Sequence, residues 1–196
     1  MGTLAVRRSV PVPFALAVAL EVALEIALTG CGGAASPASS VIPAPASPGA
    51  TGTLALTSAA FADGAPIPAR FTCDGADAAP PLAWQGAPAR TAAFALLVTD
   101  PDAGGFAHWV VGPIPASLTA LTEGMAPDAL PQGANGFGSV GWRGPCPPTG
   151  SHHYVFTLGA LPAGVRVDAP PTADGVRAAL ERALATGTLT ATYARR

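Results

Sequence analysis

Short apolar segments, each closed by glycine or proline, constrain the fold of this chain most. The segment TAAFALLVTD (91–100) is densely apolar and ends at Asp-Pro, which is typical of a strand buried on both faces. FAHWVVGPIP (106–115) and HHYVFTLGAL (152–161) have the same β-prone character, and LTATYA (189–194) is a shorter example. With 23 glycines and 22 prolines among 196 residues, long helices have little room. The sequence therefore predicts a mainly β domain of antiparallel strands.

Two further segments complete this expectation. LALTSAAF (54–61) alternates loosely and is interpreted as a strand. TADGVRAALERAL (172–184) is the one convincing helix, with Thr172 as its N-cap and apolar side chains on one face. We therefore expect a few short helices at most, including one near the C-terminus.

The N-terminus is typical of an export signal. Arg7 and Arg8 precede an almost wholly apolar run from residue 10 to 28, and LTGC (28–31) follows. LTGC resembles the lipobox of bacterial lipoproteins, in which the cysteine thiol is acylated and becomes the first mature residue. An uncleaved anchor helix is the alternative, but Glu21 and Glu25 are costlier for a segment that must stay in the bilayer. We predict a lipoprotein signal peptide over residues 1–30, lipidation of Cys31, and a lipid-anchored protein of the cell envelope, with the outer membrane or periplasmic face favoured.

The stretch after Cys31 contains mostly alanine, proline, serine and glycine up to Thr51. Such a segment has too little apolar surface to fold and too much proline to be helical. At about 3.1 Å per residue, it would hold a domain up to about 60 Å from a membrane. We therefore predict a linker over residues 31–51 and one folded domain over residues 52–196.

The charge balance excludes one class of partner. Only 11% of the residues are charged and the formal net charge is −2. A nucleic-acid partner calls for a basic patch, so no nucleic-acid binding is expected.

Acidic and imidazole side chains occur on three of the predicted strands. Asp100-Pro-Asp102 ends the first, His108 lies on the next, and His152 and His153 start a third. Read alone, the Asp-Pro-Asp run is a turn former and a strand histidine is a core residue. Two histidines and one carboxylate could also bind a metal or serve a hydrolase, but no HxxxH or CxxC spacing supports this. We predict no metal, no cofactor and no catalytic residue.

The loop GANGFGSVGWRGPCPP (133–148) is rich in glycine. Such loops let backbone N–H groups converge on an anion, although this loop lacks the lysine of a nucleotide-binding P-loop. Cys146 could act as a nucleophile with His152 as its base. A disulfide between Cys73 and Cys146 is the simpler interpretation in an exported protein, and the sequence leaves this open.

Four motifs together resemble one family. They are FTCDGADAAPPLAW (71–84), DPDAGGFAHWVVGPIP (100–115), GANGFGSVGWRGPCPPTGSHHYVFTLGAL (133–161) and TLTATYAR (188–195). The chain is similar to the bacterial Raf-kinase-inhibitor-like branch of the phosphatidylethanolamine-binding proteins. The resemblance implies a β-sandwich of two antiparallel sheets with a small anion pocket at one end.

The resemblance also implies the pocket residues. The ligand-binding set would be Asp100, Asp102, His108, Gly144, Pro145, His152 and Tyr154. Pro81 and Trp84 would form a wall or support, and His153 would face away. An aspartate beside an anion is best used to keep the imidazoles charged by raising their pKa, or to receive the ammonium of a zwitterionic headgroup.

The sequence thus predicts a binding protein for a small phosphorylated or anionic ligand, anchored to a membrane by its lipid, which could also engage a protein partner. The alternative is a protein-interaction or peptidase-inhibitor module with a vestigial pocket. A hydrolase or metalloenzyme is the third hypothesis. It ranks below the other two because the sequence contains no clear nucleophile and base.

Overall fold

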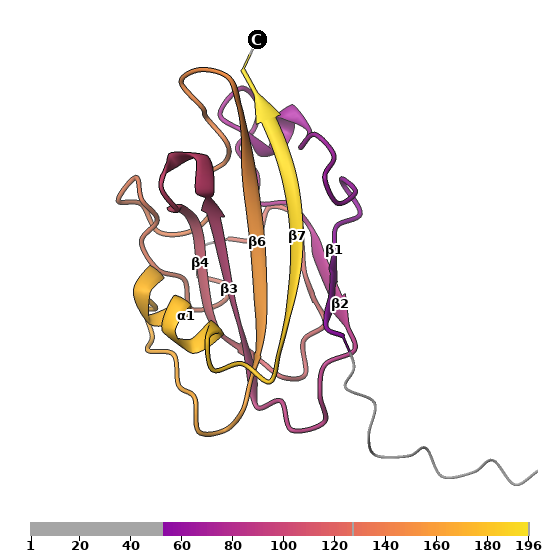
Figure 1. The fold of residues 1–196 in the computed structure, drawn as a ribbon. Helices are drawn as coiled ribbons and strands as arrows, with labels where there is room; N and C mark the ends of the chain where they lie inside the picture. The colour runs from indigo at the N-terminus through magenta and orange to yellow at the C-terminus, as the bar shows by residue number, and fades with distance from the viewer. Residues whose placement is uncertain (1–52, 127, 196) are drawn as a thin grey trace, which may run out of the picture. The chain divides into compact units, whose positions relative to one another are not determined.

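The computed structural model describes residues 53–126 and 128–195. The predicted signal peptide, Cys31 and the linker lie outside the described residues. Two antiparallel sheets form the framework, as Figure 1 shows. The predicted mainly β fold with two antiparallel sheets is therefore confirmed.

The larger sheet contains four of the predicted strands. Its order is β4-β3-β6-β7, and its strands are β3 (Ala93–Asp100), β4 (Phe106–Pro115), β6 (Ser151–Leu161) and β7 (Ala185–Ala194). In β3, the run from Phe94 to Val98 is buried on both faces. The central place of β3 follows from this, because a strand without a polar face needs cover on both sides.

The smaller sheet has the order β1-β2-β5. Its strands are β1 (Ala55–Thr57), β2 (Leu82–Gln85) and β5 (Ala120–Leu121). The strand predicted over 54–61 is thus shorter than expected. Ser58 bends the chain at this point, because its hydroxyl donates to the Pro81 carbonyl and accepts the Ala60 N–H.

Two apolar clusters hold these layers together. The first lies between the sheets and includes Trp84, Phe94, Trp109 and Phe156. The second lies between the four-stranded sheet and α1 (Ala173–Leu180), where Val110 and Val176 are fully buried. Trp109 and Val110 are neighbours in β4, and they pack on opposite faces of the sheet because side chains alternate along a strand.

The helix begins as predicted and ends earlier. The Thr172 hydroxyl accepts the Gly175 N–H, which is an N-cap contact. The helix ends at Leu180, four residues before the predicted end. The Leu184 N–H bonds to the Ala160 carbonyl of β6 instead, so the chain leaves the helix to enter β7.

Candidate functional site

A small cavity lies where β3 ends and β6 begins. Its volume is about 160 Å³, which suits a headgroup-sized ligand rather than a drug-sized one. Four predicted site residues line it, namely Asp100, His108, His152 and Tyr154, and six others complete the lining, namely Ala103, Phe106, Phe137, Cys146, Pro147 and Pro148.

Asp100 links the end of β3 to the start of β6. One carboxylate oxygen accepts the Ala103 N–H and so caps the short turn Pro101–Ala103. The other oxygen lies 2.7 Å from Nδ1 of His152. Because Asp100 is only 3% exposed, this contact fixes the orientation of the His152 ring. The Nδ1 edge of His152 is occupied, and Nε2 is the edge left for a ligand.

His108 is held by a neutral partner. Its Nδ1 lies 2.6 Å from the Arg143 carbonyl oxygen, so Nδ1 carries the proton and donates it to that oxygen. Burial lowers the pKa of His108, although the Arg143 carbonyl and the Asp100 carboxylate oppose this effect. The expectation that a carboxylate keeps this imidazole charged is therefore wrong for His108, since desolvation outweighs the attraction.

Tyr154 brings a buried hydroxyl to the lining. The side chain is fully buried, and the polar groups next to its OH are the Asp100 carboxylate and the Cys146 backbone. Burial, assisted by the charge of Asp100, raises the pKa of Tyr154, so the hydroxyl stays protonated.

Aromatic rings form another part of the lining. The ring centroids of Phe106 and Phe137 are 4.8 Å apart in an edge-to-face arrangement, and Phe137 lies 5.7 Å from His108. A Cβ at Gly136 would lie 2.4 Å from the Phe106 ring. Glycine at this position therefore lets the loop close over the ring.

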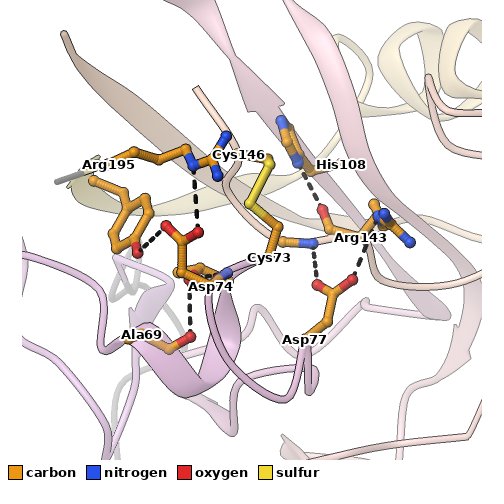
Figure 2. The surroundings of a disulfide bond; sticks show 11 residues. Ala69, Cys73, Asp74, Asp77, His108, Arg143, Cys146 and Arg195 are labelled. Carbon is orange, nitrogen blue, oxygen red and sulfur yellow. Dashed lines mark hydrogen bonds and ion pairs between the residues drawn. A yellow bond between two sulfur atoms is a disulfide. The ribbon is translucent and has the colours of Figure 1, made fainter. Parts of the chain in front are cut away.

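The segment that holds His108 is itself fixed to a second loop. Cys73 and Cys146 form a disulfide, and the Cys73 N–H donates to the Pro145 carbonyl. Asp77 accepts the Gly144 N–H at 2.7 Å, and its other oxygen lies 3.4 Å from Nε of Arg143. Figure 2 shows these contacts on either side of the Arg143 carbonyl that meets His108. Residues 143–146, which include Cys146 of the lining and the carbonyl that meets His108, thus depend on residues 73–77.

Comparison with known proteins decides the family. The model of a family described as phosphatidylethanolamine-binding protein matches residues 57–194. The chain belongs to the phosphatidylethanolamine-binding protein family.

Relatives of the family support this assignment. A Mycobacterium tuberculosis protein described as "Putative lipoprotein LppC" is 42% identical over an alignment of 166 residues. The match covers 78% of this chain and 81% of the relative. A UPF0098 protein of Methanothermobacter thermautotrophicus is 41% identical, with 64% of this chain and 88% of the relative covered.

Solved structures of the family agree with the fold. A phosphatidylethanolamine-binding protein homologue of Chlamydia trachomatis superimposes with a TM-score of 0.68 at 31% identity, covering 74% of this chain and 99% of that chain. YbcL of Escherichia coli superimposes with a TM-score of 0.66 at 32% identity. The match covers 73% of this chain and 99% of YbcL.

The structure of this family member places three predicted binding residues beside the cavity rather than in its lining. Asp102 is exposed, and one of its oxygens accepts both the backbone N–H and the Nδ1–H of His153. The His153 N–H lowers the pKa of Asp102 more than any other contact. His153 lies outside the cavity lining, and Asp102, which contacts it, lies outside the lining as well. Gly144 and Pro145 bond to the 73–77 loop instead.

Glycine at 144 has a packing reason. A Cβ there would lie 2.2 Å from the Phe71 carbonyl oxygen, so the two loops approach too closely for any side chain. The proposed supports, Pro81 and Trp84, also lie outside the lining. Trp84 packs against Phe94 between the sheets at 5.4 Å.

Sequence reasoning missed both aromatic wall residues and Asp77. Phe137 offered a signal, since it is the one aromatic residue among the glycines of GANGFGSVG. Asp77 has φ +51°, and only its contacts in the fold reveal its role.

The described residues contain neither a cluster of metal ligands nor a membrane-spanning helix. In residues 53–126 and 128–195, no three or more His, Cys, Asp or Glu side chains form a group that could hold a metal. Within the same ranges, no helix has the length and apolar character needed to span a bilayer.

Proposed function

We propose that this chain binds a small anion of the phosphate-headgroup class in the cavity between Asp100, His108, His152 and Tyr154. One observation carries the proposal. Both imidazoles have Nδ1 bonded to protein, His108 at the Arg143 carbonyl and His152 at the Asp100 carboxylate. Two Nε2 atoms are therefore left for a ligand rich in oxygen.

Proton uptake at His108 accompanies binding in this proposal. Burial favours the neutral ring, and neutral His108 presents an unprotonated Nε2. An anion in contact with Nε2 favours the charged ring, whose Nε2–H then donates. We therefore expect affinity for an anion to rise as the pH falls from 8 towards the lowered pKa of His108.

A binding role is favoured over catalysis. Cys146, the candidate nucleophile, is joined to Cys73 in the structure, and a disulfide sulfur offers no thiolate. Asp100 uses both oxygens to orient the chain and His152, which suits a positioning role.

Export and lipid anchoring are the second part of the proposal. The support is the LTGC sequence ending at Cys31, together with similarity to a mycobacterial protein described as a putative lipoprotein. Metabolic labelling with an alkyne fatty acid tests it. Label on the wild type and none on Cys31→Ser is the expected result, and label on both would overturn it.

Calorimetric titration of phosphoethanolamine into the purified protein tests the pocket. We expect millimolar or tighter binding by the wild type and at least about tenfold weaker binding by His108→Ala, because one charge-assisted contact is lost. His153→Ala, which changes an imidazole outside the pocket, is the matched control and should bind as the wild type does. No binding of either phosphoethanolamine or inorganic phosphate by the wild type at millimolar concentration would refute the proposal.

A further inference from the structure

An exposed phenylalanine stands at the mouth of the pocket on a braced loop. Phe137 is 50% exposed, and it also lines the cavity. A large apolar side chain held half in water loses the stabilisation that burial would give it. Such a residue calls for an explanation when its loop is well ordered.

The loop is ordered by a buried asparagine. Asn135 is 5% exposed, and its side-chain oxygen accepts the N–H groups of Phe137 and Ser139. Its side-chain nitrogen donates to the Gly141 carbonyl. The Gly136 N–H bonds to the Ala107 carbonyl of β4. The backbone at Phe137 is therefore fixed by polar contacts on both sides, while one part of its ring packs against Phe106 and His108.

The charges around the ring disfavour a cationic substituent on the ligand. The Arg143 guanidinium carbon lies 5.5 Å from the Phe137 ring centroid. The carboxylates near the site are already engaged, Asp100 with His152 and Asp77 with Arg143. An ammonium at the mouth would find no unpaired carboxylate in the described lining, because the one carboxylate there, Asp100, already contacts His152.

We propose that the ligand is an anion that carries an apolar substituent, such as an aryl phosphate ester, and that Phe137 selects it by packing against that substituent. The proposal rests on the proposed function, because the anionic part occupies the pocket described above. The edge-to-face pairing of Phe106 and Phe137 leaves the exposed part of the Phe137 ring for a second aromatic contact.

Calorimetry with three probes tests the proposal: inorganic phosphate, phosphoethanolamine and phenyl phosphate. Since burying the exposed half of a phenylalanine and pairing it with a ring are both favourable, we expect phenyl phosphate to bind the wild type about five- to tenfold more tightly than phosphoethanolamine. Phe137→Ala should remove that preference, so that phenyl phosphate and phosphoethanolamine bind this variant about equally tightly. Val140→Ala is the matched control, because Val140 is 53% exposed on the same loop and does not line the cavity.

The outcomes separate the two proposals. Equal binding of all three probes by the wild type, or a preference for phenyl phosphate that survives in Phe137→Ala, would overturn the role of Phe137 while the anion pocket stands. A preference of the wild type for phosphoethanolamine would also overturn the role of Phe137 and leave the anion pocket standing. No binding of any probe would overturn the anion pocket itself.

Discussion

The two imidazoles of the pocket are held by partners of different chemistry. On the carboxylate side, Nδ1 of His152 lies 2.7 Å from the buried carboxylate of Asp100. On the loop side, Nδ1 of His108 lies 2.6 Å from the Arg143 backbone carbonyl. The first contact pairs groups that can carry opposite charges, whereas the second leaves a desolvated neutral ring.

The two sides also differ in what supports them. Asp100 and His152 belong to paired regions of the four-stranded sheet. The Arg143 carbonyl belongs to a loop that is held by Asp77 and by the disulfide. The carboxylate side is therefore built into the sheet, and the loop side depends on contacts made by side chains far away in sequence.

The largest expected effect concerns the disulfide. Cys73 and Cys146 are 73 residues apart, and a loop of that size corresponds to about 4 kcal/mol of stabilisation in the chain-entropy model. Replacing both by serine should lower the free energy of unfolding by that order, as measured with urea. The histidine NMR signals should change more for His108 than for His152. A larger change at His152 would contradict the division into two sides.

On the carboxylate side, Asp100→Asn should lower the free energy of unfolding by about 2 kcal/mol, because a buried hydrogen bond to a charged group is lost. Asp102→Asn is the control, since that carboxylate is exposed, and it should leave stability nearly unchanged. If the two substitutions change the free energy of unfolding equally in chemical denaturation, the Asp100 contact stabilises the fold no more than the exposed Asp102 does.

On the loop side, Asp77→Ala removes the acceptor for the Gly144 N–H and places alanine at φ +51°. We expect a loss of about 1.5 kcal/mol. Asp77→Asn keeps an oxygen and tolerates this backbone conformation, so it should recover most of the stability. If asparagine is as damaging as alanine, the charge pair with Arg143 matters more than the hydrogen bond.

The smallest effect concerns the pH dependence of stability. Burial lowers the pKa of His108, so the unfolded chain binds this proton more readily than the folded one. The contribution of His108 is therefore present above the unfolded pKa of about 6.5 and is lost as the pH falls through the folded pKa. Relative to His108→Gln, wild-type stability should fall on acidification by less than about 1.4 kcal/mol per pH unit, because one proton is involved. A rise on acidification would mean that the ring is held charged.

The sequence predicted the fold where its pattern is strong. The dense apolar runs of β3, β4 and β6 and the Thr172 cap were recognisable because each depends on local composition. The strands β2 and β5 were not predicted. β5 has only two residues, which is too short for any periodicity to show.

The candidate site was predictable to the extent that motifs carry it. Asp100, His108, His152 and Tyr154 come together as the resemblance implied. The motif assigned Gly144 to ligand binding. In the structure, glycine is needed there because a side chain would prevent the close approach of two loops. Phe106 and Phe137 meet only because the 133–141 loop folds back on β4, and such long-range closure leaves no local pattern.

Histidine ring ¹⁵N chemical shifts, recorded with and without phenyl phosphate, test the central claim most directly. The chain has three histidines, so each signal can be assigned by single substitution. We predict that the Nε2 signals of His108 and His152 move on titration and that His108 takes up a proton, while His153 stays unchanged. An unchanged His108, or a shift confined to His153, would contradict the pocket described here.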